Sequence, residues 1–187
     1  RLGNESALRA PVDITVSAAQ VNAMRAAVRR TSQLANQLLA LSRADARSAN
    51  TQAMQRVDLR QLCEMLLEAH LDAAAAKAMD LGLEAVDVHA TGHEWLLREL
   101  LGNLLDNAIR YTPRGGSITL RCGWEAQPGV QTPLPFLEVE DNGPGVPVAE
   151  RARMLERFYR LAGTVGEGTG LGLAIAEEIA RVHNSHL

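Results

Sequence analysis

The stretch LLGNLLDNAIRYTP, residues 100–113, decides how the chain is interpreted. At 100° per residue its apolar side chains, together with Leu97, fill about half of a helix circumference, which predicts an amphipathic helix over residues 92–110. Asn103 and Asn107 lie one turn apart on the opposite stripe, so their carboxamides point the same way. A carboxamide oxygen can ligate Mg²⁺ without adding charge, and asparagine is a poor helix former. The pair indicates either a cation or phosphate site or an ordinary solvated helix face.

A carboxylate ends the strand expected over residues 134–141 and leads into the turn Asp141-Asn142-Gly143-Pro144-Gly145. Alternation along the strand puts Asp141 on the inward face, where a carboxylate is costly unless it accepts hydrogen bonds. An adenine amino group is a suitable donor, and Gly143 and Gly145 allow the backbone to approach a flat ring. The alternative is a tight turn whose own amides donate to Asp141.

A second glycine-rich stretch, GEGTGLGL at residues 166–173, opens the helix expected over residues 171–182. Backbone amides at such a helix start can bind phosphate oxygens. The stretch is not a Walker A loop, because no Lys-Ser or Lys-Thr pair follows, and no strand precedes it as in a dinucleotide-binding loop. It is therefore interpreted as a phosphate loop or as a flexible connector.

Two arginines stand just before this loop, in ERFYR at residues 156–160. Arg157 and Arg160 are spaced to clamp phosphate oxygens. Phe158 and Tyr159 are half of the two Phe and two Tyr residues of the chain. The alternative interpretation is that these two rings only anchor the loop to the core.

Composition sets limits on the class of protein. With 47% hydrophobic and 22% charged residues the chain should bury a real core, and with 3% aromatic residues that core should be aliphatic. A net charge of −3 provides no basic field for nucleic acid. Cys63 and Cys122 are expected to be small buried hydrophobes. No apolar run approaches the about 20 residues that span a bilayer, and a chain that begins at Arg1 is interpreted as part of a longer protein.

Residues 1–50 and 51–187 differ in pattern, which predicts two domains. The first range is helical and carries a coiled-coil-like seam, so it should pair with a second copy as part of a helical hairpin. The seam positions are Val21, Met24, Val28, Thr31, Ala35 and Leu38. The second range predicts helices at 58–76, 92–110 and 171–182, and strands at 80–88, 117–124 and 134–141. Because these runs do not alternate as in a doubly wound fold, we expect an α+β, two-layer α/β sandwich with helices on one face of a mainly antiparallel sheet.

Together the four motifs resemble, in order and spacing, those of the catalytic domain of sensor histidine kinases, within the Bergerat-fold (GHKL) ATPases. Residues 100–113 resemble the N box, 141–145 the first glycine box, 157–160 the F box and 168–172 the second glycine box. Residues 31–43 are similar to the second helix of the dimerisation and histidine-phosphotransfer hairpin. The resemblance covers almost the whole chain.

The resemblance implies ATP and Mg²⁺ as cofactors. Asn107 would coordinate Mg²⁺ with Asn103 beside it, and Asp141 would accept a hydrogen bond from the adenine amino group. The segment between Phe158 and Gly168 would be the ATP lid. The remaining nucleotide-binding positions implied are Arg110, Tyr111, Gly143, Gly145, Arg157, Arg160, Gly168, Thr169, Gly170, Leu171 and Gly172.

The implied reaction moves the ATP γ-phosphoryl to a histidine and then to an aspartate of a response regulator. The implied partners are a second copy, through the hairpin, and the regulator, with no nucleic acid. Membrane contact would come only through segments outside this chain, which would be the cytoplasmic portion of a bacterial inner-membrane protein. The rival interpretations are a non-catalytic or phosphatase-type dimer scaffold, and a Bergerat-fold ATPase of the topoisomerase, chaperone or mismatch-repair kind.

The chain departs from the family pattern in two places. No histidine precedes an acidic residue and an Arg-Thr-Pro-like run, so we expect binding of Mg-ATP without autophosphorylation. The five histidines lie outside the hairpin and are expected to be structural or superficial, with His93 the one to check: His70, His89, His93, His183 and His186. The strand that usually follows the last helix is also absent from the sequence.

Overall fold

The computed structural model describes residue 17 and residues 53–126, 129, 132–161 and 169–187. The chain divides into two compact units, Arg1–Ala35 and Asn36–Leu187. Apart from Ser17, the predicted hairpin of residues 1–50 lies outside the described residues, as do Gly168 and the rest of 162–168. The described strands and helices all belong to the second unit.

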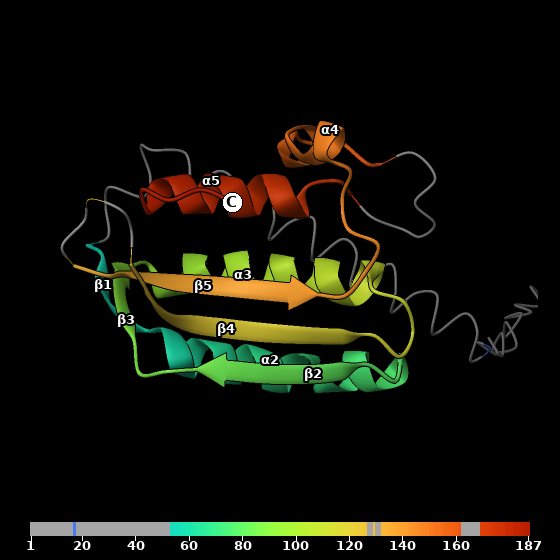
Figure 1. Ribbon diagram of the computed structural model, residues 1–187, viewed down its shortest axis with the longest axis horizontal. Coiled ribbons are helices and arrows are strands. Elements are labelled where there is room, and N and C mark those ends of the chain that lie inside the picture. The colour runs from blue at the N-terminus through green and yellow to red at the C-terminus, as the bar shows by residue number, and fades with distance from the viewer. Residues whose placement is uncertain (1–16, 18–52, 127–128, 130–131, 162–168) are drawn as a thin grey trace, which may run out of the picture. The chain divides into compact units, whose positions relative to one another are not determined.

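A three-stranded sheet forms one layer of this unit (Figure 1). Its order is β2 (Asp80–Ala85), β4 (Ser117–Glu125), β5 (Leu134–Asp141), with β4 parallel to β2 and antiparallel to β5. The sequence of residues 117–124 alternates between apolar and polar residues, which predicts that Ile118, Leu120, Cys122 and Trp124 share one face. The first three are buried, whereas Trp124, near the end of the strand, is 50% exposed and lies outside the buried core.

A smaller sheet pairs β1 (Gln55–Asp58) with β3 (His89–Gly92) in antiparallel fashion. The sequence predicted one strand over residues 80–88, but β2 ends at Ala85 and the chain turns before β3. The turn is fixed by Val88, which is fully buried and whose carbonyl accepts from the Leu59 amide at 3.0 Å. Strands of four residues carry too little periodicity to be recognised in advance.

Two helices cover one face of the three-stranded sheet, and a third packs against one of them (Figure 1). Helices α2 (Leu59–Ala76) and α3 (Glu94–Tyr111) contact the strands, whereas α5 (Gly172–Val182) packs along α3. The start of α3 differs from the prediction, because Gly92 ends β3. Two short helices, α4 (Val148–Arg151) and η2 (Arg153–Leu155), follow β5.

The opposite face of the sheet is polar, which confirms a two-layer α+β architecture. On this face Arg121 Nε lies 2.6 Å from Glu84 and Nη1 lies 2.8 Å from Glu138, and the guanidinium also contacts Glu140. These carboxylates raise the pKa of Arg121. A sheet face that carries three carboxylates around one arginine is expected to be exposed to solvent and not covered by a further layer of structure.

The core consists of two aliphatic clusters. One lies between the sheet and helices α2 and α3, and contains both cysteines as buried free thiols. The other joins α3 to α5 and includes Leu96, Leu100, Leu171 and Ile175. Over the part of the chain that the structure describes, no Phe, Tyr or Trp is buried. No helix in those same ranges is long and apolar enough to cross a bilayer.

His183 ties the end of α5 to the start of α3. Its Nδ1–H donates to the Ile179 carbonyl at 2.8 Å, and its Nε2 accepts from the His93 amide at 3.0 Å. This arrangement needs a neutral ring, and burial lowers the pKa of His183 from its ordinary value of 6.5. His93 is buried with its ring 5.9 Å from that of His183, which makes it a structural residue.

The lowered pKa of His183 predicts a pH dependence of stability. The unfolded chain binds a proton that the folded chain resists, so this contribution is present at neutral pH and is lost as the pH falls below about 6.5. We expect His183→Gln to reduce the drop in the free energy of unfolding between about pH 7.5 and 5.5, measured with urea.

His186→Gln, at an exposed position, is the control and should leave the drop unchanged. Asp106 raises the pKa of His70, so His70 contributes to the pH dependence of the free energy of unfolding with the opposite sign. This contribution is the same in the unmutated chain and in both variants, so it cancels when they are compared. An unchanged pH dependence in His183→Gln would contradict the prediction.

Candidate functional site

The two asparagines of α3 face the start of α5. A Cβ placed on Gly172 would lie 3.2 Å from Asn103 Oδ1 and 3.4 Å from Asn107 Nδ2. Asn103 is only 7% exposed and its amide donates to the Glu99 carbonyl at 2.9 Å, whereas Asn107 is partly exposed. The solvated-face interpretation is therefore wrong for Asn103, and Gly172 of the glycine stretch lies against the asparagine pair.

Asp141 ends β5 with one carboxylate oxygen held by two donors. Oδ1 accepts from the Thr112 hydroxyl at 3.1 Å and from the Gly143 amide at 2.8 Å. Thr112 is 1% exposed, and a Cβ on Gly143 would lie 2.6 Å from the same oxygen. The predicted turn-amide bond is thus present. The side chain is nevertheless exposed, not buried, because it stands at the end of the strand.

The second carboxylate oxygen, Oδ2, accepts no hydrogen bond from any residue the structure describes. The two donors to Oδ1 restrict the orientation of this exposed carboxylate. Gly145 follows in the left-handed region with φ +68° and open space beside it. This end of the site therefore presents one oriented acceptor beside an accessible backbone.

At the other end of the site, the glycine stretch is fastened to the ERFYR segment. The Phe158 amide donates to the Gly170 carbonyl at 2.8 Å, and the Leu171 amide donates to the Thr169 hydroxyl at 3.3 Å. Leu171 is buried in the α3–α5 cluster, which sets the start of α5. The glycine stretch thus leads into a helix of 11 residues, as the sequence predicted. The helix begins at Gly172, one residue later than the predicted start at Leu171.

The two aromatic residues of the ERFYR segment behave differently. The Tyr159 hydroxyl donates to Glu150, which raises the pKa of Tyr159, and the Arg153 guanidinium lies 4.4 Å from the Tyr159 ring. Phe158 is 71% exposed and has φ +66°. The anchoring interpretation therefore fits Tyr159 and is wrong for Phe158.

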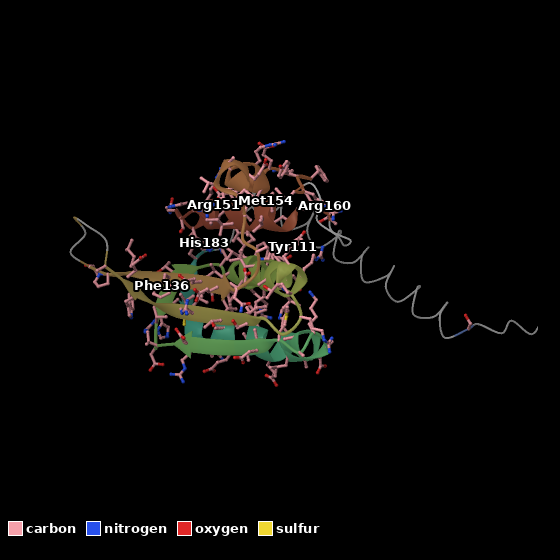
Figure 2. All side chains as sticks on the ribbon, turned by 45° about the vertical axis from the view of Figure 1, so that its right-hand side comes forward. Tyr111, Phe136, Arg151, Met154, Arg160 and His183 are labelled. Atoms are coloured by element: carbon pink, nitrogen blue, oxygen red, sulfur yellow. The ribbon has the colours of Figure 1, made fainter. Side chains whose placement is uncertain are left out.

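The charged and aromatic candidates are not buried. Arg110, Arg157 and Arg160 are exposed, and Tyr111 is half-buried at the end of α3. Figure 2 shows Tyr111 and Arg160 toward the same end of the domain, with Phe136 toward the other end.

Sequence reasoning missed two residues that shape the site. Thr112 lies inside the quoted motif, but its bond to Asp141 spans 29 positions. Lys77 donates to the carbonyls of Ile109 and Arg110, at separations of 32 and 33 residues. No local pattern signals contacts of this range.

Comparison with known proteins points to one family. A family model described as "Histidine kinase-, DNA gyrase B-, and HSP90-like ATPase" matches residues 92–187. The sensor protein kinase PmrB of Pseudomonas aeruginosa is 39% identical over 157 residues, which are 83% of this chain and 31% of PmrB. The sensor protein QseC of Escherichia coli is 36% identical over 166 residues, 88% of this chain and 34% of QseC. The chain thus spans about one third of the length of these relatives.

Solved structures show the same fold. The mycobacterial sensor histidine kinase MprB matches with a TM-score of 0.60 and 28% identity, over 70% of this chain and 80% of that one. Full-length ShkA, crystallised in complex with AMPPNP, matches with a TM-score of 0.67 and 26% identity, over 91% of this chain and 35% of that one. Each likeness extends well beyond the individual motifs.

Two glycines of the site allow a test of backbone strain against steric overlap. Gly145 and Gly170 both have left-handed φ, which costs other residues about 1–2 kcal/mol. A Cβ on Gly145 meets open space, whereas one on Gly170 would lie 2.7 Å from the Phe158 carbonyl carbon. We expect Gly145→Ala to lower the free energy of unfolding by about 1 kcal/mol, and Gly170→Ala to lower it by clearly more, in urea titrations. Equal losses would show that the Phe158–Gly170 contact is not tight.

Proposed function

Because the chain belongs to the family of histidine kinase-, DNA gyrase B- and HSP90-like ATPases, in which it forms the ATP-binding catalytic domain of a two-component sensor histidine kinase, we propose that α3, the β5 turn and the start of α5 make one Mg-ATP site. The observation that carries this proposal is the approach of Gly172 to Asn103 and Asn107. It brings the start of a helix, where an anion is favourable, to the asparagine pair.

The adenine end of the site is Asp141. With Oδ1 held by Thr112 and Gly143, the free Oδ2 is set to accept from the 6-amino group of adenine. Guanine presents a carbonyl at that position and would place two acceptors face to face. A site built around a hydrogen bond of this kind rejects analogues that lack the donor. Gly143 and Gly145 line the same end and admit a flat ring.

The metal end of the site is Asn107. Mg²⁺ takes oxygen ligands, retains several waters and is commonly held by substrate phosphates with one or two protein groups. The partly exposed carboxamide of Asn107 fits that role, whereas Asn103 is buried and bonded to Glu99. We therefore assign Asn107 as the ligand and Asn103 as the residue that orients it. The ion would neutralise charge on the phosphates during transfer.

The phosphate end combines backbone amides with arginines. The start of α5 has no side-chain cap, and the helix dipole favours an anion there. We assign Gly168, Thr169, Gly170, Leu171 and Gly172 to this loop. We place Arg110, Tyr111, Arg157 and Arg160 near the sugar and phosphates; Figure 2 supports this for Tyr111 and Arg160, which lie toward the same end of the domain.

In the whole protein, the proposed reaction transfers the γ-phosphoryl group to a histidine and then to a response-regulator aspartate. The proposed setting is a homodimer on the cytoplasmic side of a bacterial inner membrane. None of the five histidines of this chain is assigned as acceptor: His70, His89, His93, His183 and His186. We accordingly propose that the 187-residue chain binds Mg-ATP but does not phosphorylate itself, and γ-labelled ATP tests this directly.

The proposed site predicts separable losses in nucleotide binding. Asp141→Asn should raise the Kd for Mg-ATP by more than about tenfold, because the amide replaces an acceptor of a charge-assisted bond. Asn107→Ala should weaken binding in Mg²⁺ but change it little in EDTA. Titration calorimetry measures both effects.

Asp72→Asn, an exposed carboxylate change on α2, is the matched control and should leave the Kd unchanged. If the unmutated chain binds no nucleotide, the dimer-scaffold function is favoured instead. If it binds ATP and GTP equally, the role assigned to Asp141 is wrong.

A further inference from the structure

Lys77 joins the end of α2 to the end of α3. It caps α2, and its Nζ donates to the carbonyl oxygens of Ile109 at 2.6 Å, Arg110 at 2.9 Å and Thr112 at 3.4 Å. The last carbonyls of a helix lack partners within the helix, and a positive charge is favourable beside them. An ammonium group has three donors and no acceptor, so all three can be used here.

The three carbonyls belong to the turn that carries much of the proposed nucleotide pocket. Arg110 and Tyr111 lie in this turn, and Thr112 ends it with a buried hydroxyl that donates to Asp141 Oδ1. A path of hydrogen-bonded groups therefore runs from the Lys77 ammonium to the Thr112 backbone, and from the Thr112 side chain to the carboxylate. Because Thr112 is 1% exposed, water cannot replace its partners freely.

We propose that Lys77 is a positioning residue for nucleotide recognition: it fixes the turn at the end of α3 and thereby holds the Asp141 carboxylate in the orientation that accepts from adenine. The inference rests on the proposed ATP-binding function. Lys77 itself acts through Thr112 and makes no contact with the base.

A lysine that only stabilises the helix end would give a different result. Loss of such a cap lowers stability and weakens every nucleotide equally. Loss of a positioning residue for Asp141 specifically weakens binding of a base with a 6-amino group. Inosine triphosphate, which carries a carbonyl in place of that amino group, is therefore the discriminating probe.

Arg114 supplies a matched control. Its Nη1 donates to the Ala76 carbonyl at 2.9 Å, so it connects the same two segments as Lys77. Arg114 is exposed, and among the described residues it makes no hydrogen bond to Ile109, Arg110 or Thr112. Arg114→Met removes a cationic link between α2 and the residues after α3 while leaving the three-carbonyl contact of Lys77 in place.

The experiment measures the Kd of Mg-ATP and of Mg-ITP for the unmutated 187-residue chain and for four variants. These are Lys77→Met, Arg114→Met, Thr112→Val and the double variant that combines Lys77→Met with Thr112→Val. We expect the unmutated chain to prefer ATP by about tenfold, the value of one hydrogen bond to a charged group. Lys77→Met should weaken ATP by about five- to tenfold and ITP by less, so that the preference falls. Arg114→Met should keep the preference, and the double variant should lose no more of it than Thr112→Val alone.

Equal weakening of ATP and ITP by Lys77→Met would overturn the inference, as would additive loss of preference in the double variant. If Lys77→Met does not fold by circular dichroism, Lys77→Gln, which retains one neutral donor, is subjected to the same comparison and judged by the same outcomes. An unmutated chain that binds neither nucleotide would refute the proposed function itself. Binding of ATP with an unchanged preference in the folded Lys77 variant would refute only the role of Lys77.

Discussion

The structure depends on the close approach of α5 to α3 at a position without a side chain. Gly172 lies against the carboxamides of Asn103 and Asn107, and an added Cβ would lie in tight contact with Asn103 and in van der Waals contact with Asn107. Polar contacts alone do not hold this approach. The apolar cluster directly behind it, with Leu100, Leu171 and Ile175 buried, contributes about 1.5–3 kcal/mol for each large side chain. Aliphatic packing thus creates the polar site.

A second constraint acts at the opposite end of the site and is polar throughout. The end of α3 is an unpaired set of carbonyls, and Lys77 satisfies three of them with one ammonium group. Asp141 then receives its orientation from Thr112 and Gly143 rather than from burial. An exposed carboxylate thereby has a restricted orientation, since both of its donors belong to the fold.

The sequence predicted those features that repeat at short range. The faces of α3, the alternation of β4 and the glycine-led start of α5 each follow from periodicity within one element. The parallel pairing of β2 with β4, the short strands β1 and β3, and the burial of Asn103 follow from packing between distant segments. The contacts of Lys77 and Thr112 could not be predicted from the sequence for the same reason, because their partners lie 29 to 35 residues away.

The two ends of the site are therefore stabilised by different forces, and this has a consequence for recognition. Phe158 is held at φ +66° and 71% exposed by contacts on both sides, through the Gly170 carbonyl and the bond of Tyr159 to Glu150. Such strain persists only where neighbours enforce it. The proposed phosphate end thus depends on the packing of α5 and on backbone bonds of the ERFYR segment. The proposed adenine end depends on the contact that Lys77 makes between α2 and α3, so we expect changes near the start of α5 to alter phosphate binding without altering base selectivity.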